Sequence, residues 1–153
     1  MIVRPMRQAD LRQVAKIEEN SFSDPWRYED FEDSLNREDD TILLLVAVDD
    51  DDTAVCGYVT LYGAAGEGEI MNIAVDETKR RAGVATCLMN GIKELAVDKG
   101  MELESIFLEV RKSNAPAIAF YEKCGYEQIG VRKGFYQNPP EDALLMKLEV
   151  AKA

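Results

Sequence analysis

The sequence predicts a single domain of mixed α/β (α+β) class, built on one mixed and mostly antiparallel sheet flanked by helices. Its 153 residues suit one domain with a sizeable core. The first half contains short β-rich runs separated by turn residues, a pattern typical of an antiparallel meander. The second half alternates helical and strand-like apolar spacing, as crossover connections require. We therefore place the domain at residues 1–150 and a short tail at 151–153.

The chain begins with a predicted strand and two predicted helices. Met1–Pro5 is a short β-rich run. Asp10 is expected to cap a helix whose apolar residues fall on one face. A loop over Ser21–Trp26 separates it from a second short helix at Tyr28–Leu35.

Three predicted strands follow and form the meander. They are Thr41–Val48, Ala54–Tyr62 and Glu69–Val75. The acidic turn Asp49–Asp52 and the glycine-rich turn Gly63–Gly68 connect them, because such residues favour tight, solvated turns.

The apolar spacing becomes helical at Val84–Leu95, and Gly100 lies just past the end of that helix. A short apolar run, Ser105–Val110, then predicts a buried strand. The helix thus joins two strands of one sheet as a crossover.

A second helix follows this buried strand. Ser113 and Asn114 supply N-cap chemistry, Pro116 fits the first turn, and Gly125 offers a left-handed stop. The remaining predicted elements are a strand through Val131, a loop containing Tyr136, and a final strand from about Ala143 to Val150.

Composition excludes several classes of partner. Lys plus Arg total 18 against 29 Asp plus Glu, a net charge of −11, which disfavours nucleic acid and would attract a basic peptide or small cation. The alternative is that the acidic surface serves solubility alone. Cys56, Cys87 and Cys124 lack metal-ligand spacing and the chain has no histidine, so we expect reduced packing cysteines and no metal. No apolar window approaches about 18 residues and no leader follows Arg4 and Arg7, which predicts a cytoplasmic protein without membrane association.

Three polar side chains surround the second strand-to-helix turn. Glu109 lies near the carboxyl end of the buried strand, Asn114 starts the next helix, and Tyr121 lies about two turns into it. A carboxylate, an amide and a phenol can provide a base, an anchor and an acid. The alternative is that Glu109 pairs with Arg111, Asn114 only caps, and Tyr121 only packs.

The turn before the first crossover helix has the composition of an anion site. Arg80 and Arg81 precede the small residues Ala82, Gly83 and Ala85 at a helix amino terminus, where free N–H groups and the helix dipole attract anions. It contains neither a Walker loop nor the three-glycine dinucleotide motif. A plain helix start with two exposed arginines is the alternative.

With both segments, the chain resembles the GNAT superfamily of acetyl-CoA-dependent N-acetyltransferases, whose phosphate-binding pattern matches Arg80-x-x-Gly83-x-Ala85. Within it, the chain resembles the RimI branch, which acetylates the amino-terminal alanine of a ribosomal protein. The further matching segments are Phe22-x-x-Pro25-Trp26, Asn72 to Asp76, Leu108 to Arg111, Ser113-Asn114, Tyr121-Glu122 and Glu141 to Ala143.

The resemblance implies a sheet splayed between the strands that end near Val75 and Glu109, with acetyl-CoA in the gap. The implied cofactor residues are Ile73, Ala74 and Val75 along the pantetheine arm, Arg81, Ala82, Gly83, Val84, Ala85 and Thr86 around the pyrophosphate, and Asn114 beside the pantetheine.

The resemblance also implies that Glu109 is the catalytic base and Tyr121 the acid. A phenol is a weaker acid than a thiol by only about 1.5 pKa units, so Tyr121 can serve as the acid without needing a large pKa shift. Glu69 is an alternative base, and Trp26 and Tyr136 either contact the acceptor or are packed loop aromatics. The expected acceptor is the amino terminus of a ribosomal protein or another basic peptide. A lysine, a polyamine or an aminoglycoside remains an alternative, as does an acyl-CoA-binding regulatory module without turnover. The oligomeric state stays open, with a monomer favoured.

Overall fold

The computed structural model describes residues 1–37 and 39–150, so the predicted tail at 151–153 lies outside the described residues. Seven strands form one sheet in the order β1-β2-β3-β4-β5-β7-β6. The strands are β1 (Ile2–Pro5), β2 (Ile42–Val48), β3 (Val55–Ala64), β4 (Glu67–Val75), β5 (Ser105–Arg111), β6 (Glu127–Tyr136) and β7 (Glu141–Glu149). The α-helices are α1 (Leu11–Ser21), α2 (Tyr28–Asn36), α3 (Val84–Asp98) and α4 (Ala115–Lys123). The predicted fold class is confirmed.

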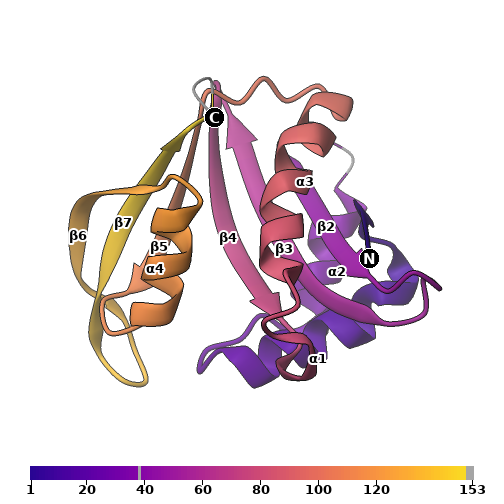
Figure 1. Ribbon diagram of the computed structural model, residues 1–153, viewed down its shortest axis with the longest axis horizontal. Helices are drawn as coiled ribbons and strands as arrows, with labels where there is room; N and C mark the ends of the chain where they lie inside the picture. The colour runs from indigo at the N-terminus through magenta and orange to yellow at the C-terminus, as the bar shows by residue number, and fades with distance from the viewer. Residues whose placement is uncertain (38, 151–153) are drawn as a thin grey trace.

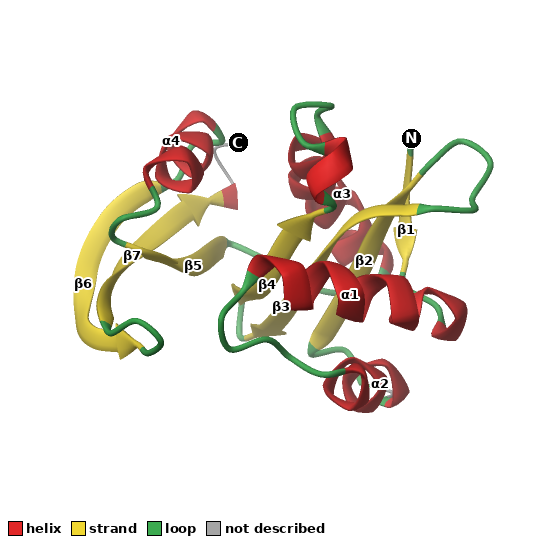
Figure 2. Cartoon of the chain, turned by 90° about the horizontal axis from the view of Figure 1, so that it is seen from below, coloured by secondary structure: helices red, strands yellow, loops and turns green. Residues whose placement is uncertain are grey.

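Helices cover the sheet unequally. Figure 2 shows α3 and α4 on one face, while α1 and α2 lie on the other and cover only the β2–β4 half. Strand β2 is buried along its whole length because helices lie on both sides of it. The face of β5, β7 and β6 opposite α4 therefore remains open.

Two hydrophobic cores result from this arrangement. One lies under α3 and α4 and includes Leu88, Ile92 and Leu108. The other lies under α1 and α2 and is built around Phe31 and Tyr58. The sheet separates the two cores, so a side chain's position along a strand decides which core it enters.

Strands β4 and β5 separate soon after they meet. They are parallel and pair only through Glu67–Glu69 with Ser105–Phe107, although both strands continue well beyond these residues. Figure 1 shows the two strands together at one end of the molecule and diverging toward the other. The splayed sheet implied by the family resemblance is present.

The glycine-rich turn between β3 and β4 is shorter than predicted. The strands continue to Ala64 and Glu67, leaving only Ala65 and Gly66 as the turn, with φ of +53° and +82°. Two consecutive positive φ values match the twist of a two-residue hairpin. The predicted turn over Gly63–Gly68 was therefore too wide.

Strand β6 is longer than predicted. It extends to Tyr136, which pairs with Glu141 of β7, so Tyr136 ends a strand and does not belong to a loop. The connecting loop is confined to Gln137–Pro140, where Pro139 and Pro140 cannot donate the N–H bonds that a sheet requires.

Asp10 occupies the N-cap position of α1, but its side chain does not cap that helix. Its carboxylate accepts hydrogen bonds from the Arg7 backbone N–H (2.7 Å) and from both terminal nitrogens of Arg4 (2.8 and 2.9 Å). The bidentate arginine pair has displaced the predicted capping bond.

Within the described ranges, no helix combines the length and apolar character that crossing a bilayer requires.

The start of α3 is pressed against the sheet at Gly57. A Cβ atom at this position of β3 would lie 2.8 Å from Val84 Cγ1 and 2.9 Å from the Ala74 carbonyl oxygen. A side chain of any size is therefore excluded, and the glycine fixes the distance between β3 and the first residue of α3.

We expect Gly57→Ala to lower the free energy of unfolding by about 1–3 kcal/mol, because the Ala74 carbonyl cannot move without shifting β4. Urea denaturation followed by circular dichroism measures this change. Gly130→Ala is the matched control, since nothing lies within 4 Å of its added Cβ. Equal stability of the two variants would contradict the tight contact.

Candidate active site

The turn between β4 and α3 is shaped by two residues with positive φ. Arg81 and Gly83 have φ of +67° and +79°, and Gly83 is the N-cap residue of α3. The first bond of the helix runs from the Cys87 N–H to the Gly83 carbonyl (3.0 Å), so the N–H groups before it point out of the helical ladder. These groups belong to Val84, Ala85 and Thr86. Together with the exposed side chains of Arg80 and Arg81, they make a turn suited to an anion, and residues 80–86 are called the anion-binding turn for this expected role.

The divergent part of β4 leads into this turn. Ile73 and Val75 are half-buried, and their side chains pack against the core under α3. Ala74 points to the other face and belongs to the core under α1 and α2. Of the three predicted cofactor residues on β4, Ala74 can therefore contribute only its backbone.

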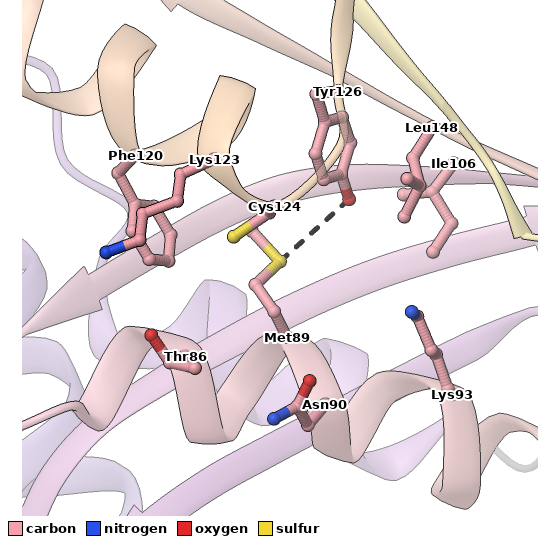
Figure 3. Close-up of a pocket in the computed structure, with 10 residues that line it drawn as sticks. All are labelled: Thr86, Met89, Asn90, Lys93, Ile106, Phe120, Lys123, Cys124, Tyr126 and Leu148. Atoms are coloured by element: carbon pink, nitrogen blue, oxygen red, sulfur yellow. Dashed lines mark hydrogen bonds between the residues drawn. The ribbon is translucent and has the colours of Figure 1, made fainter. Parts of the chain in front are cut away.

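A cavity of about 340 Å³ lies between α3 and α4 (Figure 3). Thr86 lines it, so the cavity begins at the anion-binding turn. Lys93 and Lys123 add two ammonium groups, while Phe120 supplies an aromatic wall. The other lining residues are Met89, Asn90, Ile106, Cys124, Tyr126 and Leu148. The cavity thus offers apolar walls and positive charge, the features that a phosphorylated aromatic ligand needs.

Glu109 points to the face of β5 opposite α4, because its neighbours Leu108 and Val110 are buried in the core under α3 and α4. Its side chain is only 11% exposed, and Arg132 Nε lies 3.4 Å from its Oε1. Burial raises the pKa of Glu109, the charge of Arg132 lowers it, and the charge of Glu69 raises it. Arg111, the partner considered from sequence, instead pairs with Glu141.

Tyr121 lies two turns into α4, as predicted, and packs against the core under α3 and α4. Its ring makes edge contacts with Phe120 and Tyr126, whose centroids lie 5.6 and 6.0 Å away. Burial raises the pKa of Tyr121 well above that of an ordinary phenol. The phenol of Tyr121 therefore holds its proton more firmly than an ordinary tyrosine does.

Asn114 occupies the N-cap position of α4, where its Oδ1 accepts the Ala117 N–H (3.3 Å). The capping alternative considered from sequence is thus present. The side chain is exposed, and its amide nitrogen can still donate to a ligand beside the end of β5.

Tyr136 lies close enough to Glu109 for the carboxylate charge to act on its phenol. Burial raises the pKa of Tyr136 to about 12, with a further contribution from Glu109. The guanidinium of Arg111 lies 4.5 Å from the ring centroid. The structure therefore places Tyr136 in the same electrostatic environment as the two predicted catalytic residues.

Glu69 is a second carboxylate on the face of the sheet that carries Glu109. It is exposed and pairs across the sheet with Tyr62, whose hydroxyl lies 3.5 Å from Ser34 Oγ of α2. Glu69 therefore faces the same side as Glu109, and the two charges interact. The structure brings both possible bases to one face.

Two loops meet across this face. The Asn138 amide of the β6–β7 loop donates to both carboxylate oxygens of Asp24 in the α1–α2 loop (3.1 and 3.3 Å). Arg111 donates to Ser23 Oγ (3.3 Å) and to the carbonyls of Gln137 (2.7 Å) and Pro139 (2.9 Å). These contacts join the half of the molecule that contains α1 and α2 to the half that contains β5, β6 and β7, on the face of the sheet where Glu109 lies.

Trp26 belongs to the same α1–α2 loop. Its ring packs against Phe31 with the centroids 5.2 Å apart, and its backbone N–H donates to the carboxylate of Glu18 (2.9 Å). The packed-aromatic alternative therefore holds for Trp26, while its half-buried ring still borders the loop.

Sequence reasoning missed several residues of this region. Lys93 and Lys123 lie on separate helices, and Arg111 joins segments that are far apart in the chain. For Lys93, the one available signal was its place on α3, the helix that leads into a buried strand.

Among the described residues, no three His, Cys, Asp or Glu side chains gather closely enough to hold a metal ion.

Comparisons with known proteins identify the family of this chain. Residues 10–126 match the model of the acetyltransferase (GNAT) family. The chain is 33% identical over 156 residues to an N-alpha-acetyltransferase of Saccharolobus solfataricus, a match covering 94% of this chain and 90% of that protein. It is 29% identical over 144 residues to the ribosomal protein bS18-alanine N-acetyltransferase of Salmonella typhimurium, covering 93% of each.

A solved structure shows the same architecture. The crystal structure of the ribosomal-protein-S18-alanine N-acetyltransferase from Escherichia coli aligns with a TM-score of 0.82 at 25% identity, covering 97% of this chain and 93% of that one. The family model spans most of the chain and includes the anion-binding turn, Glu109 and Tyr121. This chain therefore belongs to the GNAT family of acetyltransferases.

Proposed function

We propose that this protein transfers an acetyl group from acetyl-CoA to the amino-terminal amine of a protein, with the terminal alanine of ribosomal protein bS18 as the expected acceptor. One observation carries the proposal: Glu109 and Tyr121 come from opposite faces of the sheet at the place where β4 and β5 diverge. The name of the Salmonella relative supports the choice of acceptor.

The residues present fit acetyl-CoA, which supplies the acetyl group as a thioester. The turn over residues 81–86 offers N–H groups and the cationic side chain of Arg81 to the pyrophosphate, and the backbone edge of Ile73 and Val75 can bond the amides of the pantetheine arm. Asn114 can donate to the same arm. The cavity with Lys93 and Lys123 suits the phosphorylated adenosine end.

Glu109 would accept the proton of the attacking amine. Its partial burial and raised pKa make the ionised carboxylate a stronger base than an exposed one. A terminal amine has a pKa of about 7.7–8.0, against about 10.4 for lysine, so a single carboxylate can suffice for the former. Glu69 remains the alternative base because it lies on the same face.

Tyr121 would donate its proton to the departing sulfur. An ordinary phenol is already about 1.5 pKa units weaker as an acid than a thiol, and burial of Tyr121 widens this gap. Full transfer before C–S cleavage is therefore unfavourable. The phenol acts by a hydrogen bond that becomes proton transfer as negative charge develops on the sulfur.

The two bridged loops support a chain terminus as the acceptor. The Asp24–Asn138 contact lies on the side of the sheet from which an amine must approach Glu109. A terminal amine can approach a carboxylate beside these bridged loops end-on, whereas a lysine within a chain must bring backbone on both sides of it. The net charge of −11 suits a basic acceptor peptide.

The acceptor class is tested with a panel of peptides that begin with Ala, Ser or Met, together with spermidine and a lysine peptide blocked at its amino terminus. Release of free thiol from acetyl-CoA is measured. We expect turnover with the Ala-started peptide and little with the blocked lysine peptide or spermidine. Equal turnover with the blocked lysine peptide would overturn the proposal, and release with none would indicate a binding module.

Glu109→Gln should lower kcat/KM by about 10²-fold or more at neutral pH, because a general base contributes at least this much. The deficit should shrink toward alkaline pH, where more of the acceptor amine is already neutral. Glu69→Gln is the matched control and should change the rate less than about threefold. Loss of activity in Glu69→Gln alone would transfer the role of base to Glu69.

Tyr121→Phe should lower kcat by about 10²–10⁴-fold while the affinity for acetyl-CoA changes little, because only the hydroxyl is removed and the ring contacts remain. Steady-state kinetics and calorimetric titration with CoA measure the two quantities. Tyr126→Phe, which alters a neighbouring buried phenol, serves as control. Near-normal turnover in Tyr121→Phe would remove this residue from the mechanism.

A further inference from the structure

The carboxylate of Glu18 is buried between α1 and the sheet, and it takes no part in the proposed chemistry. The residue is 2% exposed. Its two oxygens accept three hydrogen bonds: from the Tyr58 hydroxyl, from the Trp26 backbone N–H (2.9 Å) and from the Asn72 side-chain amide (3.0 Å). All three donors are neutral groups.

A buried carboxylate with neutral partners is a costly way to stabilise a core. Burial raises the pKa of Glu18, while the three donors lower it. Burial and the nearby carboxylate also raise the pKa of Tyr58, which keeps that phenol protonated as a donor. Apolar residues of similar volume often stabilise such a position as well or better. Stability alone therefore does not account for the carboxylate.

The three donors belong to separate parts of the site. Trp26 lies in the loop on the acceptor side, Tyr58 is in β3, and Asn72 is in the divergent part of β4, next to Ile73. Asn72 is itself fixed by Thr60, whose hydroxyl donates to the amide oxygen (2.5 Å) and accepts the Asn72 N–H (3.1 Å). One carboxylate thus connects the acceptor-side loop with the strand that borders the cofactor.

Aromatic packing connects the same loop and strand a second time. The Trp26 ring packs on Phe31, and the Phe31 ring meets Tyr58 edge-on with the centroids 5.5 Å apart. Tyr58 in turn donates to Glu18. The loop is therefore held at its backbone by the carboxylate and at its side chain by the ring stack.

We infer that Glu18 is a positioning residue that sets the distance between the α1–α2 loop and β4, and so aligns the acceptor amine with the thioester. The inference rests on the proposed acyl transfer. It predicts an effect on acceptor use and not on acetyl-CoA affinity, because α3 and the cavity between α3 and α4 lie on the other face of the sheet.

Two substitutions separate hydrogen bonding from packing. Glu18→Met keeps the approximate volume but cannot hold the loop, so the acceptor KM should rise about tenfold. Glu18→Gln keeps one oxygen for the Trp26 and Asn72 donors, while the Tyr58 hydroxyl can turn to accept from the new amide, so the acceptor KM should stay within about threefold. Glu19→Gln, on the exposed side of the same helix, is the matched control.

Trp26 provides a readout that does not depend on turnover, because it is the sole tryptophan of the chain. Acrylamide quenching of its fluorescence should increase in Glu18→Met and remain near the wild-type value in Glu18→Gln. Calorimetry with CoA should give a Kd within about twofold of the wild type for every variant. If Glu18→Met does not fold, Glu18→Asp, whose side chain is too short to reach all three donors, is measured in the same way.

Unchanged acceptor KM and quenching in the folded Met or Asp variant would overturn the inference, and so would equal losses in Glu18→Met and Glu18→Gln. The acceptor is the one that the wild type uses best in the panel. Failure of the wild type with every acceptor would refute the proposed function instead, and the quenching series would still decide whether Glu18 holds the loop.

Discussion

The interruption of pairing between β4 and β5 is the constraint on which the site depends. A parallel sheet normally continues as long as both strands do, because each buried backbone group left without a partner costs about 1–3 kcal/mol. Here pairing ends at Glu69 with Phe107, and each strand is held on its other side by a long antiparallel neighbour. The open edge of β4 is therefore available to a ligand that carries amide groups of its own.

The same interruption gives the two faces of the sheet different roles. The anion-binding turn, the cavity and Tyr121 lie on the side of α3 and α4. Glu109, Glu69 and the bridged loops lie on the side of α1 and α2. A cofactor and an acceptor can thus approach from opposite faces and meet only where the strands diverge.

Two carboxylates of this chain show how surroundings determine function. Glu18 is completely enclosed and satisfied by three neutral donors, so it has no lone pair directed at a substrate. Glu109 is 11% exposed and has one cationic neighbour at 3.4 Å, which leaves it room to receive a proton. The same carboxylate chemistry thus suits the positioning role proposed for Glu18 and the role of base proposed for Glu109.

Local signals explain what the sequence could predict. Gly83, Asn114 and Gly125 act within a few residues of themselves, and each occupies the cap or turn expected of it. Contacts between distant segments carry no such local signal. The joining of Ser23 to Arg111 depends on how the two halves pack, and β6 continues past Val131 only because β7 lies beside it.

Because α3 packs tightly against Gly57, the two halves of the molecule would contribute differently to the binding of a ligand. The turn that would receive the pyrophosphate is fixed before any ligand arrives, so little conformational entropy is lost there. The half formed by β5, β7, β6 and α4 is joined to it by three residue pairs in the sheet and by the loop contacts of Arg111 and Asn138. A ligand in the gap would act as the missing strand and add backbone pairing between the two halves.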